Sequence, residues 1–488
     1  MSHVIVIGSG IGSLASALRL RAKGHKVKVI EANEKVGGKL DVHRSMGYRW
    51  DTGPSLFTMP HFVDELFKLF NENPREHFNY QKQPIVCNYF WEDGTRFSSN
   101  AQTEKFCEDA AKTFNEPKQK IADYLAKSAL KYDLTASLFL EKSLHKFSTY
   151  TSIQAAKSVL KMGKLDIPST LNEVNEASFS NPNLIQLFNR FATYNGSSPY
   201  KTPGIMSMIP TLEMQFGTFY PQGGMRSIVE SLHALGERNG VEFFFNEKAT
   251  SIDYSKGKIT GVTTEKGFYN AEIVVSGIDA FYTYTSLLPK LKAPTKTLGQ
   301  EKSSSAIIFY WGVKKSFPEL DLHNIFFSEN YREEFDAIFN QKKRSKDSTI
   351  YLNISSKADS NDAPQKCENW FVMINVPTNE GQNWKQLVAE AKTQIIEKLS
   401  RSLNINLNEL IESEEVLDPV KIELKTSSHQ GSLYGSASNS KFSAFLRHPN
   451  FSNQIKGLYF CGGSVHPGGG IPLCLKSGQI VADLIPEA

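Results

Sequence analysis

The sequence has few cysteines and no long apolar run. The five cysteines (Cys87, Cys107, Cys367, Cys461 and Cys474) are scattered, odd in number and without C-x-x-C spacing. This usage argues against a disulfide framework or a zinc site, and it indicates a reducing compartment. No run of about 18 apolar residues is present. We therefore expect no bound metal and no helix that spans a bilayer.

A strong excess of one charge is also missing. The net charge of +4 over 488 residues gives no reason to expect a nucleic-acid partner. The first predicted strand begins so close to Met1 that no room is left for a signal peptide. We therefore expect a cytoplasmic location, which does not exclude binding at a membrane surface.

Phenylalanine is what the chain has in excess, with 32 Phe against 5 Trp. Such a surplus suits a large apolar cavity or a lipid-facing surface, although a large core accounts for it as well. A chain of 488 residues is too long for one compact core, so at least two lobes are expected.

The first forty residues have the pattern of a dinucleotide-binding βαβ unit. In chain order they contain a strand (4–7), a glycine turn (Gly8, Gly10, Gly12), a helix (13–23), a second strand (27–30) and Glu31. The glycines let the backbone and the helix N-terminus approach a pyrophosphate, and the acid at the strand end can bind a ribose. Ser13 stands where a third glycine is usual, and a βαβ unit without a nucleotide is the alternative interpretation.

Two further segments bear on which dinucleotide is bound. Gly37-Gly38-Lys39 follows the acid, as in flavoproteins whose FAD lies extended across the sheet, and this favours FAD over NAD. Asp51-Thr52-Gly53-Pro54-Ser55 then fixes a backbone that can sit close to a planar ring. From composition alone, an ordinary loop explains the second segment too.

The middle of the chain alternates between helical and strand patterns. Residues 61–70 have helical apolar spacing, residues 85–97 form a predicted hairpin around Asp93-Gly94, and residues 101–190 are predicted to be helical. Further strands are expected at 241–245, 273–276, 305–313, 323–327 and 370–377, and a helix at 384–403.

Residues 142–164 carry five lysines and no acidic residue, interleaved with apolar side chains. A basic amphipathic helix of this kind suits an anionic membrane surface. A solvated lysine face over an ordinary core is the alternative of equal weight.

The C-terminal segment is the second informative one. A strand at 457–461 ends in Gly462-Gly463-Ser464, and the run from Val465 to Pro472 leads into a helix that ends at Leu484. Pro472 suits the first turn of that helix. The positive end of the helix, beside the pyrimidine side of a flavin, would stabilise the anion formed on reduction.

Taken together, the segments GSGIGSLASALRL, EANEKVGGKL, DTGPSLFTMP and YFCGGSVHPGGGIPLCLKSGQIVA resemble the bacterial phytoene-desaturase-type carotenoid desaturases, and the resemblance covers nearly the whole chain. Among the subgroups, DTGPSLFTMPHFVDELF and NPREHFNYQKQPIVCNYFWEDGT look most like the 1-hydroxycarotenoid 3,4-desaturases of flavobacterial type. Two positions depart from the family: Ser13, and Ser276-Gly277-Ile278-Asp279, where Asn-Ala-Asp is usual.

The resemblance implies an FAD enzyme that removes two hydrogens from a C–C bond next to a polyene, with flavin N5 as the hydride acceptor. It implies a carotenoid substrate, with oxygen or a quinone as electron acceptor. The basic segment 142–164 adds the expectation of peripheral attachment to a membrane. By position it assigns Gly8, Gly10 and Gly12 to the pyrophosphate, Glu31 to the ribose, Lys39 to the phosphates, Gly53, Pro54 and Ser55 to the isoalloxazine, Gly463 to the ribityl phosphate, and Gly470, Ile471 and Pro472 to the pyrimidine edge. His466, inside the flavin-facing motif, is a candidate base, with loop ordering as the alternative role.

The expected fold class is α/β. A Rossmann-like FAD-binding domain is expected from residues 1–75, 215–300 and 420–488, and a discontinuous α+β substrate domain, with a helical membrane-associating part, from residues 76–214 and 301–419. Other reactions possible on this scaffold are phytoene desaturation, carotene isomerisation, polyene saturation and terminal-methyl oxidation. An amine-oxidase-type flavoenzyme is a more distant alternative, and a flavin-containing carotenoid carrier is the non-enzymatic one.

Overall fold

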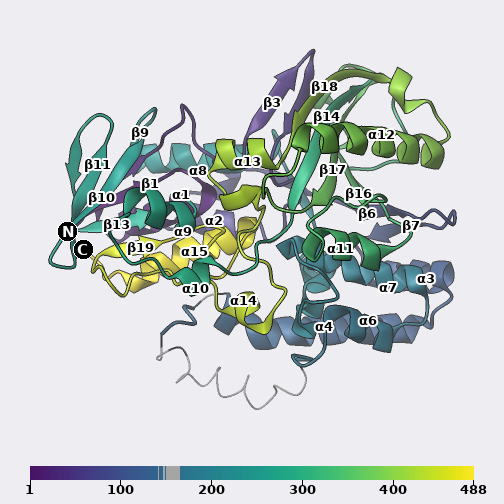
Figure 1. Cartoon of the computed structure of the whole chain (residues 1–488), viewed down its shortest axis with the longest axis horizontal. Helices are drawn as coiled ribbons and strands as arrows, with labels where there is room; N and C mark the ends of the chain where they lie inside the picture. The colour runs from purple at the N-terminus through teal and green to yellow at the C-terminus, as the bar shows by residue number, and fades with distance from the viewer. Residues whose placement is uncertain (141, 147–148, 150–164) are drawn as a thin grey trace.

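The computed structural model describes residues 1–140, 142–146, 149 and 165–488, arranged around two main sheets with a helical region beside the larger one (Figure 1). The basic amphipathic helix predicted at 142–164 lies almost entirely outside the described residues. Among the helices that are described, none combines the length and apolar character needed to cross a membrane.

A five-stranded sheet lies at the end of the molecule where both termini are found (Figure 1). Its order is β19-β13-β1-β2-β9 and every neighbouring pair is parallel. The strands are β1 (His3–Ile7), β2 (Lys26–Ile30), β9 (Glu242–Phe244), β13 (Ile273–Ser276) and β19 (Leu458–Phe460). These bounds confirm the five strands predicted for this part of the chain. Because the strands are parallel, their carboxyl ends share one edge.

One face of this sheet is covered by the helices α1 (Ile11–Ala22), α2 (His61–Lys68), α8 (Arg226–Arg238) and α15 (Ile471–Leu484). The other face packs against the antiparallel strands of residues 249–270. Small residues let α1 and α15 approach closely, since a Cβ at Gly478 would lie 2.7 Å from the Gly12 carbonyl oxygen. The first and last helices of the fold are therefore packed directly against each other.

The second main sheet has seven strands, in the order β18-β14-β17-β16-β15-β6-β7. Its strands are β6 (Ile85–Phe90), β7 (Arg96–Asn100), β14 (Ser305–Val313), β15 (His323–Phe326), β16 (Ile350–Ile354), β17 (Glu368–Val376) and β18 (Ile411–Leu417). All nine residues of β14 are buried, so the strand is covered on both faces. The helix α12 (Trp384–Leu403) packs on one face through an apolar core.

The helical region lies beside this sheet and consists of α3 (Thr103–Phe114), α4 (Lys118–Phe139), α6 (Leu171–Ser178) and α7 (Pro182–Asn189). Its core is rich in phenylalanine, with Phe97, Phe106, Phe114, Phe188 and Phe191 among the buried members. Much of the phenylalanine surplus is therefore used in an ordinary core.

Several smaller elements were not predicted from the sequence. They are the three-stranded sheet β10 (Ala249–Ser255), β11 (Lys258–Thr264) and β12 (Phe268–Asn270), the pair β5 (Tyr80–Lys82) with β8 (Phe219–Pro221), and the helices α9 (Ala280–Tyr282), α10 (Thr295–Leu298), α11 (Tyr331–Phe339), α13 (Pro419–Thr426) and α14 (Lys441–Phe445). The pair β3 (Val42–Ser45) with β4 (Tyr48–Asp51) forms around Gly47, where the turn-rich sequence predicts two strands.

Candidate active site

One cavity of about 1560 Å³ connects the carboxyl edge of the five-stranded sheet with the face of the seven-stranded sheet. Four parallel strands end at it, with Gly8 after β1, Glu31 after β2, Gly277 after β13 and Gly462 in the turn after β19. This edge is where ligands bind in open parallel sheets. All thirteen site residues predicted from the sequence line this cavity.

We divide the cavity into two parts. The glycine cleft is the part lined by residues 8–12, Glu31, 37–39, 53–55, Gly463 and 470–472. The inner cavity is the part lined by the seven-stranded sheet and by residues 190–213.

The glycine cleft owes its shape to glycines, which have no side chains to fill it. A Cβ built on Gly10 or Gly470 would meet no atom within 4 Å, so both backbones face open space. Gly8 has φ +85°, which only glycine adopts readily. A Cβ at Gly53 would lie 1.8 Å from the Lys39 carbonyl oxygen, so the 51–55 segment packs backbone to backbone on Lys39. These open backbone surfaces fit an extended dinucleotide.

Glu31 is held rigidly at the end of β2. Its carboxylate accepts hydrogen bonds from the backbone N–H of Ser9 at 2.8 Å and of Asn33 at 2.9 Å. The Ser9 hydroxyl (2.6 Å) and the Asn33 amide (2.7 Å) fill its remaining acceptor positions. A ribose hydroxyl would therefore replace one of these two rotatable side-chain donors.

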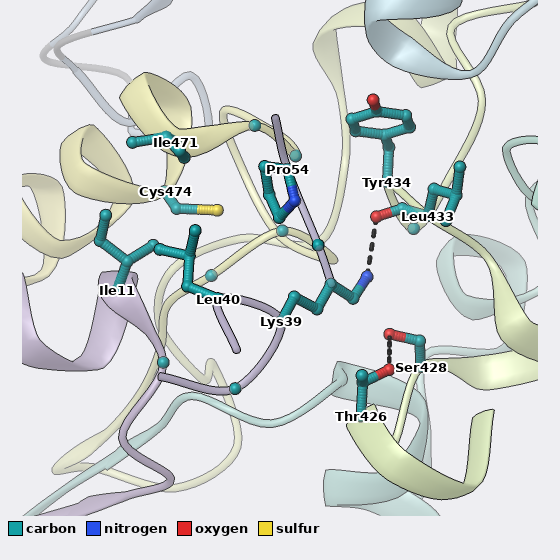
Figure 2. A pocket seen from close by; sticks show the side chains of 18 of the residues that line it. Ile11, Lys39, Leu40, Pro54, Thr426, Ser428, Leu433, Tyr434, Ile471 and Cys474 are labelled. Carbon is teal, nitrogen blue, oxygen red and sulfur yellow. Dashed lines mark hydrogen bonds between the residues drawn. The ribbon is translucent and has the colours of Figure 1, made fainter. Parts of the chain in front are cut away.

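Lys39 lies between the glycine cleft and the loop at 432–433. Its Nζ donates to the Leu433 carbonyl at 2.7 Å and to the Ser432 carbonyl at 3.3 Å. Figure 2 shows this side chain reaching toward Leu433, with Pro54 close by. Burial lowers the pKa of the Lys39 ammonium. In this arrangement Lys39 joins two loops of the cavity wall and brings a positive charge to it.

The two departures from the family pattern are one structural feature. A Cβ at Gly277 would lie 1.8 Å from the Ser13 Oγ, so the serine hydroxyl occupies the space of a side chain at position 277. Ser13 is buried beside Cys461, with 3.9 Å between Oγ and Sγ. A serine at 13 thus requires glycine at 277, and the sequence pattern alone did not link the two positions.

The C-terminal wall of the cleft contains an arginine that sequence reasoning missed. Arg447 is buried, and its Nη1 donates to the Tyr434 carbonyl at 2.7 Å. Its guanidinium also packs on Gly468, whose Cβ would lie 3.1 Å from Cζ. Burial lowers the pKa of Arg447 to about 10. It lies in an irregular loop with no recognisable motif, so no local signal identified it.

His466 is buried beside the cleft, and its ring is hydrogen-bonded. The ring Nε2 lies 2.9 Å from the Lys142 carbonyl, which can only accept, so Nε2 carries the proton. Burial lowers the pKa of His466 to about 4. Its own carbonyl accepts from the Asn450 amide at 2.8 Å. This geometry favours the loop-ordering role over the role of base.

Two rows of side chains on the seven-stranded sheet form the floor of the inner cavity. Ile325 pairs with Tyr351, Tyr351 with Met373, and Met373 with Ile308, and all four line the cavity. In the next row His323, Phe371 and Tyr310 line it as well. Most of this floor is apolar or aromatic, as an extended hydrocarbon ligand requires.

A chain of hydrogen bonds connects the floor to the cleft. The Ser55 hydroxyl lies 2.7 Å from the Tyr351 hydroxyl, which lies 2.8 Å from Nδ1 of His323. The Asn353 amide nitrogen also lies 3.2 Å from Nδ1, so Nδ1 is the acceptor and the proton is on Nε2. Burial, reinforced by the charge of Arg190, lowers the pKa of His323 to about 3.

The inner cavity also contains a buried ion pair. Arg190 begins a short 3-10 helix (Arg190–Asn195), and Glu213 lies in a π-helical turn (Leu212–Phe216). The Arg190 Nη2 donates to both Glu213 oxygens, at 2.8 and 2.6 Å, and Arg190 Nε donates to the Tyr89 hydroxyl at 2.8 Å. The Tyr194 hydroxyl also donates to Glu213. Apart from the aromatic loop in which Arg190 lies, no sequence pattern indicates this pair.

Comparison with known families defines the class of the protein. The model of the flavin-containing amine oxidoreductases matches residues 14–486, and the chain belongs to this family. It has the mixed α/β fold of FAD-dependent amine oxidases and is an FAD-dependent oxidoreductase. The predictions of the cofactor and of the enzyme class are therefore confirmed.

The curated relatives are similar over their whole length. The chain is 58% identical over 487 residues to a 1-hydroxycarotenoid 3,4-desaturase of Flavobacterium sp. (strain P99-3), which covers 100% of the chain and 99% of the relative. It is 31% identical to a 4,4'-diapolycopene oxygenase of Methylomonas sp, with 99% of this chain and 98% of the relative covered. The resemblance to carotenoid desaturases is thus confirmed.

Solved structures support the fold alone. An oxidoreductase from Methanosarcina mazei has a TM-score of 0.64 at 16% identity, with 99% of this chain and 100% of that chain covered. Wild-type putrescine oxidase bound to putrescine has a TM-score of 0.64 at 14% identity, with 99% and 98% covered.

Proposed function

We propose that the protein is an FAD-dependent carotenoid desaturase that introduces a 3,4 double bond into a 1-hydroxycarotenoid. The observation that carries the proposal is the full-length identity of 58% to a relative with that name. The cavity supports it, because it joins a cleft shaped for a dinucleotide to an inner cavity with a largely apolar floor.

Residues of the glycine cleft would hold the cofactor. Gly10 and Gly470 leave backbone space for it, Glu31 offers acceptors at the ribose end, and Arg447 and the N-terminus of α15 bring positive charge to the other end. When bound, FAD supplies the acceptor for a hydride from the allylic carbon.

The inner cavity would position the substrate. Its aromatic and aliphatic floor holds a polyene flat against the sheet and excludes water from the reacting bond. We propose residues 1–75, 215–300 and 420–488 as the FAD-binding domain, and residues 76–214 and 301–419 as the substrate domain. Oxygen or a quinone would reoxidise the flavin.

The direct test is turnover of defined carotenoids. FAD-loaded protein is incubated with hydroxylated and non-hydroxylated carotenes, and the polyene absorption band and product mass are recorded. Desaturation predicts a red shift and the loss of two hydrogens. An unchanged mass would indicate isomerisation, a gain of two hydrogens saturation, and a gain of oxygen terminal oxidation. The absence of change with every carotenoid would contradict the proposal.

Two controls separate the remaining alternatives. Under anaerobic conditions a carrier leaves the flavin yellow, whereas a desaturase bleaches it when substrate is added. Release of hydrogen peroxide with amines instead of carotenoids would indicate an amine oxidase.

We further propose peripheral attachment to a membrane near α14. Phe442 and Leu446 are 75% and 39% exposed, and the adjacent Phe445 lines the cavity and packs on Phe139 at a ring distance of 4.8 Å. An apolar substrate could thus pass directly from lipid to the cavity. Sedimentation with anionic vesicles should fall for Phe442→Ser and for the triple variant Lys157→Glu, Lys161→Glu and Lys164→Glu. Equal sedimentation of wild type and both variants would contradict this attachment.

A further inference from the structure

The Arg190–Glu213 ion pair is buried in a largely apolar cavity, where charged side chains are rare. Arg190 is 6% exposed and Glu213 2% exposed. Nearby lining residues include Val86, Met206, Ile209 and Leu212, which would pack around a hydrocarbon without any charge. Removing two charges from water is expensive, and replacing such a pair with apolar residues is often neutral or stabilising. Stability alone therefore does not account for it.

The pair leaves one charged donor unused. Nη2 and Nε of Arg190 are both bonded to protein acceptors. Within the described part of the chain, the other terminal nitrogen, Nη1, has no hydrogen-bond partner, and protein atoms do not seal it from the cavity. The rings of Tyr89, Phe191 and Tyr194 surround the guanidinium and fix its position. A fixed cationic donor in an apolar cavity calls for an acceptor on the ligand.

We propose that Arg190 binds the hydroxyl oxygen at the end of the substrate and so selects hydroxylated over non-hydroxylated polyenes. This inference rests on the proposed function. The hydroxyl oxygen accepts from Nη1, while Glu213 and the Tyr89 hydroxyl keep the guanidinium in place. Arg190 is thus a specificity residue that binds the substrate away from the reacting atoms.

The position of Arg190 agrees with the spacing in the proposed substrate. In a 1-hydroxycarotenoid desaturated at the 3,4 bond, three covalent bonds separate the oxygen from C3, so the two atoms lie within about 4 Å. Tyr89, Ile325 and Tyr351 are register partners across three adjacent strands. Arg190 is hydrogen-bonded to the Tyr89 hydroxyl, and Ser55 is hydrogen-bonded to the Tyr351 hydroxyl. About 10 Å of sheet therefore separates the hydroxyl site from the cleft, which leaves room for the reacting carbons between them.

The orientation of the substrate follows from this placement. The hydroxylated end enters first and reaches Arg190, so that its 3,4 bond lies over the floor between Tyr89 and Tyr351. The remaining polyene extends back along the cavity toward its mouth. A substrate without the hydroxyl leaves Nη1 buried without an acceptor, which is the more costly arrangement.

The test compares discrimination between a hydroxylated carotene and its non-hydroxylated analogue. The double variant Arg190→Met with Glu213→Met removes both charges at similar volume. The single variant Arg190→Lys keeps the ion pair but has no second terminal nitrogen. We expect the ratio of kcat/KM for the hydroxylated substrate to kcat/KM for the non-hydroxylated one to fall by about 10- to 100-fold in the double variant. The same ratio should fall by less in Arg190→Lys. The fall should come from a lower kcat/KM for the hydroxylated substrate and a higher kcat/KM for the non-hydroxylated one, which no longer leaves Nη1 buried without an acceptor.

A matched control is the pair Lys357–Glu368, which is joined at 2.8 Å and does not line the cavity. The variant Lys357→Met with Glu368→Gln loses a partly buried ion pair elsewhere and should keep the wild-type ratio. An unchanged ratio in a folded, flavin-loaded double variant would overturn the inference. If that variant does not fold, an unchanged ratio in Arg190→Lys overturns it.

A binding experiment keeps this inference distinct from the proposed function. With the flavin reduced by dithionite, no turnover occurs, and quenching of protein fluorescence reports carotenoid binding. Wild type should bind the hydroxylated carotene at least about 10-fold more tightly than its analogue, and the double variant should bind both equally. A wild type that binds with this preference but never desaturates would contradict only the proposed function. A wild type that desaturates without the preference would contradict only the role of Arg190.

Discussion

The glycine cleft and the inner cavity belong to one continuous space but are built in opposite ways. Absent side chains form the cleft, where Gly10, Gly53 and Gly470 bring backbone close to a ligand or to other backbone. Side chains from separate elements form the inner cavity, and its polar groups are connected by hydrogen bonds such as Ser55–Tyr351–His323. A cleft made of backbone tolerates almost no added atom, whereas a cavity made of side chains can change its specificity one residue at a time.

The largest expected effect comes from adding side chains to the cleft. Gly10→Val places its side chain in open space, so the variant should fold but lose flavin, because the added atoms occupy the cofactor space. We expect at least a ~100-fold loss of FAD affinity, measured by flavin absorbance after gel filtration. Gly53→Ala should instead lower the melting temperature, because its Cβ would lie 1.8 Å from the Lys39 carbonyl oxygen. Gly94→Ala, at a turn away from the cavity, is the control for flavin content.

The Ser13–Gly277 pair is the next test, because it concerns packing under the cleft. Gly277→Ala should destabilise the protein by about 1–3 kcal/mol through the clash with the Ser13 hydroxyl. The double variant Ser13→Gly with Gly277→Ala should recover most of this loss, since the serine is then absent. Urea unfolding of the two single variants and the double variant measures the coupling. Additive effects would show that the two positions are independent.

The two regions also differ in how well sequence predicted them. The strands of the five-stranded sheet, the glycines and Glu31 follow short local patterns, and the structure brings all of them to one cavity. Arg447, Arg190, Glu213 and Tyr351 were missed because their neighbours in space come from distant segments. Arg190 and Tyr351, for example, are brought together only by the pairing of β6, β15 and β16. The Ser13–Gly277 relation required the contact itself.

Acid should destabilise both regions through buried histidines. Burial lowers the pKa of His323 to about 3 and that of His466 to about 4, against 6.5 when unfolded. The unfolded chain then binds more protons, so this stability is complete above about pH 6.5 and is lost as the pH falls toward about 4. At pH 5, each histidine should lower the free energy of unfolding by about 2 kcal/mol relative to its value at neutral pH. Urea unfolding at pH 7.5 and pH 5 should show a smaller pH effect in His466→Gln, and an equal effect would contradict this assignment.

The smallest expected effect concerns Tyr351, the residue that joins the two regions. Tyr351→Phe removes the hydroxyl between Ser55 and His323 and should destabilise the protein by about 1 kcal/mol. Tyr284→Phe is the matched control, because Tyr284 is also bonded to a buried histidine, at 3.2 Å, but does not line the cavity. If the connection positions Ser55 against the cofactor, only Tyr351→Phe should also lower kcat and shift the flavin absorption band. Equal stability losses with no kinetic or spectral difference would show that the two parts of the cavity work independently.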